Sequence, residues 1–306
     1  MKHSLFRLAI IAGSAVATSL VAQTPAAPAV VTQTPAPATK APAPPQLPLP
    51  APSPTSTLKQ RVGFTDIEIV YARPGAKGRT MIGKVEKYGD VWRTGANNAT
   101  TITFSTAVKL GGKDVPAGKY ALFTIPNANE WTIIINKGAA QWGAFTYDAG
   151  ADLVRFNVTP VRLNEHVETF EIGIGDIKDD SATINLTWEK LRVPFKLELD
   201  VVGPTLAKID ELMAGEGRKP YAQAAGFYLE HGQDLNKALA WIEAAIAAGA
   251  NQTSMHLKAK ILAKMGRKDD AIAAAKQSIE LAMKSTSKGV QTEYTKLNEN
   301  LIASLK

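Results

Sequence analysis

The 306 residues contain no cysteine and only four histidines. Without cysteine, disulfide bonds, thiolate metal sites, iron–sulfur clusters, cysteine nucleophiles and lipid-modified cysteines are all excluded within this sequence. No two histidines lie within five positions of each other; they are His3, His166, His231 and His256. The nucleophile elbow, the zinc-protease motif, the phosphate-binding loop and the dinucleotide loop are also missing. We therefore expect no catalytic residue set, no metal and no cofactor, and we favour a binding protein over an enzyme.

The N-terminus has the pattern of an export signal. Lys2 and Arg7 precede an apolar or small run over residues 8–22, which predicts a signal peptide over residues 1–22. An uncleaved membrane anchor is the alternative, but the run is shorter than the roughly 20 residues that span a bilayer. The sequence therefore predicts export, and the periplasm and the extracellular space remain equally open.

Residues 23–57 hold 11 of the 18 prolines and a single charged residue, Lys40. Such a composition cannot form a hydrophobic core and favours extended polyproline II. We interpret residues 23–57 as a disordered Pro/Ala-rich linker that acts as a semi-rigid spacer. A docking motif for a partner is the alternative.

The net charge of +7 is spread over three parts of the chain and forms no basic cluster. Residues 1–57 carry +3, residues 58–200 carry +1 and residues 201–306 carry +3. Nucleic-acid binding requires a concentrated basic face. This distribution argues against a nucleic-acid partner.

Residues 58–201 alternate between apolar and polar side chains with the period of β-strands. Turn residues separate the strands, for example Gly111-Gly112 and Pro116-Ala117-Gly118. Many short strands without a helical period predict an antiparallel β-sandwich. The clearest predicted strands are residues 101–104, 131–136, 154–158, 170–174, 184–188 and 193–199.

Three short motifs inside this region resemble a known bacterial family. They are Tyr-Ala-Arg-Pro at 71–74, Trp-Arg-Thr-Gly-Ala-Asn at 92–97 and Pro-Ala-Gly-Lys-Tyr at 116–120. In these motifs, residues 63–200 resemble domain of unknown function 2911, whose members are typically exported. Ala72 and Asn98 depart from the serine and glutamate that are frequent in that family. The resemblance implies no established activity.

The same motifs supply a candidate ligand site. Arginine forks bind carboxylates, asparagine amides offer both donors and acceptors, and tryptophan offers a stacking face. A sugar or an anionic group is the ligand that this set predicts. The alternative is structural, with arginines that brace strands and asparagines that complete tight loops. The candidate residues are Arg73, Arg79, Trp92, Arg93, Asn97, Asn98 and Trp142.

Acidic residues offer two weaker possibilities. Asp148, Asp152 and the acidic residues within 176–180 stand in predicted loops, as calcium ligands do, but without the spacing of an EF-hand. A carboxylate-dependent carbohydrate-active hydrolase would need two carboxylates at a defined separation, which a sequence does not reveal.

Residues 202–306 change to a helical period. We predict helices over residues 205–213, 220–230, 235–248, 254–265, 269–284 and 289–305. Gly232 and Gly266 are 34 residues apart, the period of tetratricopeptide repeats. This indicates a tetratricopeptide-like domain that binds a protein or peptide partner. The alternative is that these helices only pack on the sandwich and stabilise it.

Together these features predict an exported, non-enzymatic envelope protein that binds a ligand, a glycan or a protein. A carbohydrate-active hydrolase and a purely structural scaffold are the alternatives.

Overall fold

The computed structural model describes Leu47 and residues 49–306. The predicted signal peptide, and the predicted linker up to residue 46, lie outside the described residues. The first strand, β1 (Thr55–Val62), includes the last three residues of the predicted linker. Its whole length pairs with β2 (Thr65–Ala72), so residues 55–57 belong to the sheet and not to the linker.

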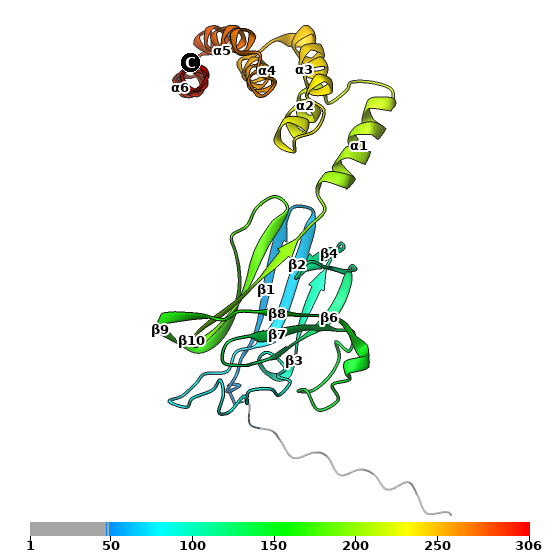
Figure 1. Cartoon of the computed structure of the whole chain (residues 1–306), viewed down its shortest axis with the longest axis vertical. Coiled ribbons are helices and arrows are strands. Elements are labelled where there is room, and N and C mark those ends of the chain that lie inside the picture. Colours follow the sequence, from blue (N-terminus) through cyan, green and yellow to red (C-terminus); the bar gives the residue numbers. More distant parts are fainter. Residues whose placement is uncertain (1–46, 48) are drawn as a thin grey trace, which may run out of the picture. The chain divides into compact units, whose positions relative to one another are not determined.

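The described strands form two antiparallel sheets (Figure 1). The six-stranded sheet has the order β1, β2, β3 (Ala96–Phe104), β6 (Gly118–Ile125), β7 (Trp131–Asn136) and β8 (Asp152–Val158). The four-stranded sheet has the order β5 (Lys113–Val115), β4 (Val108–Leu110), β10 (Ser181–Glu198) and β9 (Val161–Gly175).

Both sheets contribute side chains to one hydrophobic cluster. Ile69 and Ile102 enter it from the six-stranded sheet, and Leu110, Ile184 and Leu197 enter it from the four-stranded sheet. Each of these side chains is fully buried, which contributes roughly 1.5–3 kcal/mol per residue. The predicted antiparallel β architecture is therefore confirmed, with both sheets closing over a common core.

One strand boundary was predicted wrongly. Residues 184–188 and 193–199 were expected as two strands, but β10 runs without interruption from Ser181 to Glu198. The register with β9 shifts on both sides of Glu189, which has a φ of 51°. A β-bulge at this point joins the two alternating runs, and it explains why the alternation breaks while the strand continues.

The six predicted helices are all present, and they bury a hydrophobic cluster of their own. Gly232 and Gly266 follow α2 and α4 with φ values of 63° and 77°, a left-handed conformation that favours glycine after a helix. Ala238 and Ala271 are completely buried at equivalent places in α3 and α5. These features agree with the repeat hypothesis, which stays a prediction. The helices are α1 (Val202–Ala214), α2 (Tyr221–Glu230), α3 (Leu235–Gly249), α4 (Gln252–Lys264), α5 (Lys268–Met283) and α6 (Lys288–Leu305).

Among the described residues, no helix is both long enough and apolar enough to cross a membrane.

Candidate functional site

Trp92 belongs to the core and not to a ligand surface. Only 3% of it is exposed, and its ring stacks on Trp188 with centroids 5.7 Å apart and planes 16° apart. Its Nε1 donates to the Gly95 carbonyl at 3.1 Å, and its backbone pairs with Thr124 of β6. The prediction of Trp92 as a stacking face for a ligand is therefore corrected, because its indole N–H is hydrogen-bonded and its ring is packed inside the protein.

The chain that follows Trp92 has an unusual backbone. Thr94 and Asn97 have φ values of 54° and 60°. Asparagine tolerates this left-handed region, whereas a β-branched threonine rarely adopts it. Thr94 is held there by its own burial and by the hydroxyl of Thr100, which donates to the Thr94 carbonyl at 2.6 Å. Strain of this kind clusters at functional sites, and here it directs Asn97 and Asn98 to the exposed surface.

A loop over residues 137–147 lies against the start of β3. The Ala99 N–H donates to the Gln141 carbonyl at 3.1 Å, and the Gly143 N–H donates to the Asn97 carbonyl at 2.9 Å. Asn98 and Trp142 form a bridge between the two segments. Trp142 is 61% exposed despite these backbone bonds, so the loop presents its indole to solvent.

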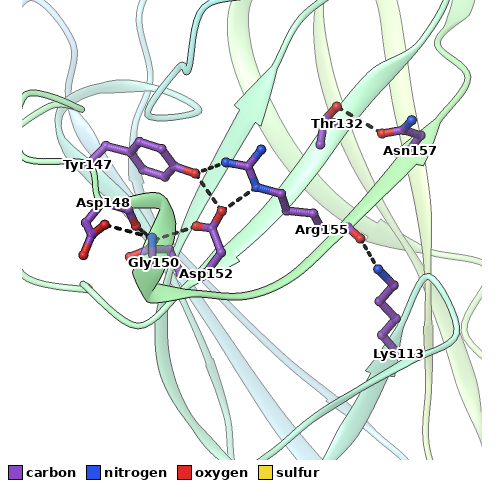
Figure 2. Close-up of polar contacts among 9 residues, drawn as sticks. Lys113, Thr132, Tyr147, Asp148, Gly150, Asp152, Arg155 and Asn157 are labelled. Carbon is purple, nitrogen blue, oxygen red and sulfur yellow. Dashed lines mark hydrogen bonds and ion pairs between the residues drawn. The ribbon is translucent and has the colours of Figure 1, made fainter.

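A partly buried polar cluster anchors the far end of this loop (Figure 2). The Tyr147 hydroxyl donates to the Asp152 carboxylate at 2.7 Å, and Arg155 donates to both of these residues. The Tyr147 ring packs edge-on against Phe123 on the outer side of the six-stranded sheet, with centroids 5.1 Å apart. These contacts fix the loop that carries Trp142.

The same contacts occupy the acidic residues that were considered as calcium ligands. Asp152 also accepts a hydrogen bond from the Asn136 amide at 2.7 Å. Asp148 caps the backbone N–H of Gly150 at 2.8 Å, as Figure 2 shows. The two carboxylates therefore serve the packing of this loop.

The loop and the sheet enclose a groove of about 490 Å³, which we call the Trp142 groove. Three of the seven predicted site residues line it, namely Asn97, Asn98 and Trp142. Sequence reasoning missed its other polar side chains, because the pairing of the loop with β3 has no signature in the sequence. These side chains are Thr55, Thr101, Lys119 and Gln141.

Arg73 and Arg79 lie elsewhere and brace the protein. Arg73 donates to the Phe170 carbonyl of β9 at 3.0 Å and lies 3.6 Å from the Glu171 carboxylate. Arg79 donates to the carbonyls of Ala76 and Gly75 in its own loop. Both arginines thus follow the structural alternative, although Arg79 also lines a separate hollow with Arg162, His166 and Glu168.

Arg93 lies beside the Trp142 groove but does not line it. Its Nη1 atom is 3.7 Å from the position that a Cβ atom on Gly143 would take. Its Nε is buried and has no hydrogen-bond partner among the described residues. Burial raises the pKa of the nearby Glu86 carboxyl, and the positive charges of Arg93 and Arg79 offset part of that rise.

We expect Trp92→Ala to lower the free energy of unfolding by about 3–5 kcal/mol, because it leaves a large cavity in the shared core. Trp142→Ala should change it by no more than about 0.5 kcal/mol, since the indole is mostly exposed. Urea unfolding followed by tryptophan fluorescence compares the two variants. Equal destabilisation by both would contradict the assignment of Trp92 to the core and Trp142 to the surface.

We expect Glu86→Gln to stabilise the protein at neutral pH. The pKa of Glu86 is higher in the folded chain than in the unfolded chain, so the wild type loses stability as the pH rises through that folded value. The glutamine variant lacks this loss, and its melting temperature should exceed that of the wild type at pH 7 and match it near pH 4. Glu165→Gln, on an exposed position of β9, is the control and should show no such pH-dependent difference.

Comparison with known proteins places this region in a family. No curated protein and no solved structure matches the chain. Residues 53–197 match the family model described as protein of unknown function (DUF2911). This matched segment holds all but the last residue of the two sheets, and it includes the residues that line the Trp142 groove.

Proposed function

We propose that this protein is an exported, non-enzymatic carbohydrate-binding protein, and that the Trp142 groove holds the sugar. The observation that carries the proposal is the exposed indole of Trp142 beside the amide side chains of Asn97, Asn98 and Gln141. A pyranose ring has an apolar face that stacks on an indole, and its equatorial hydroxyls need donors and acceptors at the rim. The groove offers both.

The pre-formed loop supports binding further. Backbone hydrogen bonds from Ala99 and Gly143 hold Trp142 in place before any ligand arrives, and a rigid site loses less conformational entropy on binding. The anchor at Tyr147, Asp152 and Arg155 adds to this rigidity.

The composition of the groove favours binding over hydrolysis. Glycoside hydrolysis generally uses a pair of carboxylates on either side of the scissile bond. Among the described residues that line the Trp142 groove there is no aspartate or glutamate. The hydrolase alternative would need carboxylates beside the sugar stacked on Trp142, and the Trp142 groove does not supply them.

Export belongs to the same proposal. The predicted signal peptide and proline-rich spacer would place the sheets outside the cytoplasm, either in the periplasm or in the extracellular space. A carbohydrate-binding domain would meet envelope or environmental glycans there.

Trp142→Ala should abolish sugar binding or weaken it by at least about tenfold, because the sugar loses the apolar area buried on the indole together with roughly 0.5–1.5 kcal/mol of stacking. The six probes are maltohexaose, cellohexaose and chitohexaose, together with oligomers of galacturonate, mannuronate and hyaluronan. Binding is measured by isothermal titration calorimetry on the full chain.

Phe145→Ala is the matched control, because Phe145 is 82% exposed on the same loop but does not line the groove. It should bind as the wild type does. Wild-type protein that binds none of the six probes, or binding that survives Trp142→Ala, would overturn the proposal.

The helices support a second candidate function, the binding of a protein partner. A hollow of about 680 Å³ lies between the α1–α2 connection and α3, and Arg218, Lys219, Tyr221 and Ala245 are among its lining residues. Small residues beside basic and aromatic ones suit an extended acidic peptide. We expect Tyr221→Ala to reduce the recovery of a partner in a pull-down from envelope extract. Recovery of the same proteins by the wild type and the variant would contradict this assignment.

A further inference from the structure

We infer that the ligand is an acidic oligosaccharide that extends from Trp142 along the outer face of β1, β2 and β3, with a uronate carboxylate bound by Lys119. The inference rests on the proposed carbohydrate function and specifies both the length and the charge of the ligand.

A second hollow of about 480 Å³ continues the Trp142 groove along the sheet. Val70 and Thr101 line the first hollow, while Glu68 and Thr103 line the second. On each of these strands the two residues are two positions apart and therefore point to the same face. The register of the sheet also places Lys119, which lines the first hollow, directly opposite Thr103, which lines the second. The two hollows are thus neighbouring parts of one polar surface.

The surface is too long for a single sugar. Along β1, the lining residues run from Thr55 in the first hollow to Arg61 in the second. Six residue steps of a strand cover roughly 20 Å. A linear oligosaccharide of several units fills that length, with one unit stacked on Trp142.

The charges on this surface favour an acidic ligand. Lys119 is exposed and is the one charged residue among the described residues that line the first hollow. Lys59 is neutralised by Glu68 at 2.8 Å, and Arg61 is neutralised by Asp66 at 2.7 Å.

Lys119 forms no ion pair in the part of the chain that the structure describes. It lies close enough to Glu68 for its charge to act on that carboxylate. The pKa of Glu68 is lowered mainly by the hydrogen bond and the charge of Lys59, and to a smaller degree by the charge of Lys119. A carboxylate on the ligand would form an ion pair with Lys119, the one positive charge of this surface that lacks an ion-pair partner among the described residues.

The first test compares ligands on the unmodified full chain. Calorimetry at low salt would measure galacturonic acid, its tetramer, and the methyl-esterified tetramer, which has the same shape without the charge. The same comparison is repeated with oligomers of mannuronate and of hyaluronan. At least one acidic oligomer should bind about tenfold more tightly than its monomer and roughly three- to fivefold more tightly than its uncharged ester.

The second test removes the charge from the protein. Lys119→Gln should weaken binding of the acidic oligomer by roughly three- to fivefold and leave binding of the ester unchanged. Lys109→Gln removes the same charge from β4 of the other sheet and should bind as the wild type does.

Two outcomes would overturn the inference in different ways. If ester and acid bind equally, or if only neutral oligosaccharides bind, and Trp142→Ala still abolishes binding, the acidic ligand is wrong but the carbohydrate site stands. If no oligosaccharide binds, the proposed function fails together with the inference.

Discussion

The stacking of Trp92 on Trp188 is the contact on which the rest of the β region depends. Trp92 pairs with β6 of the six-stranded sheet, and Trp188 belongs to β10 of the four-stranded sheet. Phe170 and Trp131 pack against Trp92 with centroid distances of 5.1 and 6.1 Å. Aromatic pairs of this geometry stabilise a core beyond the area that they bury. The cluster therefore joins the two sheets, and it fixes the point from which residues 93–98 leave the core.

From this fixed point, one short segment serves two purposes. The residue before it, Trp92, is buried, and its last residues, Asn97 and Asn98, are exposed at the groove. The left-handed backbone of Thr94 and Asn97 makes the change of direction. The loop that carries Trp142 is then held on this segment by backbone hydrogen bonds and on the sheet by Tyr147. The packing of Trp92 and the backbone hydrogen bonds of Ala99 and Gly143 thus hold both walls of the groove. This explains why its side chains are in place without a ligand.

Patterns with a clear period could be predicted from the sequence, and long-range pairings could not. The strand over residues 131–136 and all six helices follow from apolar periodicity and from turn residues such as Gly232 and Gly266. The continuation of β10 through Glu189 was missed because a bulge interrupts the alternation without ending the strand. In the candidate site, three of the seven predicted residues line one groove, and the sequence did not reveal which of the seven side chains are buried. Nothing local distinguishes a buried Trp92 from an exposed Trp142, and Lys119 and Gln141 join the groove only through pairings between distant segments.

A crystal structure of the full chain with the most tightly bound oligosaccharide tests the central claim most directly. The account predicts a sugar ring stacked on the indole of Trp142, with its hydroxyls within hydrogen-bond distance of the Asn97 and Asn98 side chains. It also predicts that Trp92 keeps its place between the two sheets. A ligand bound away from this groove, or a Trp142 side chain packed into the protein, would contradict the account.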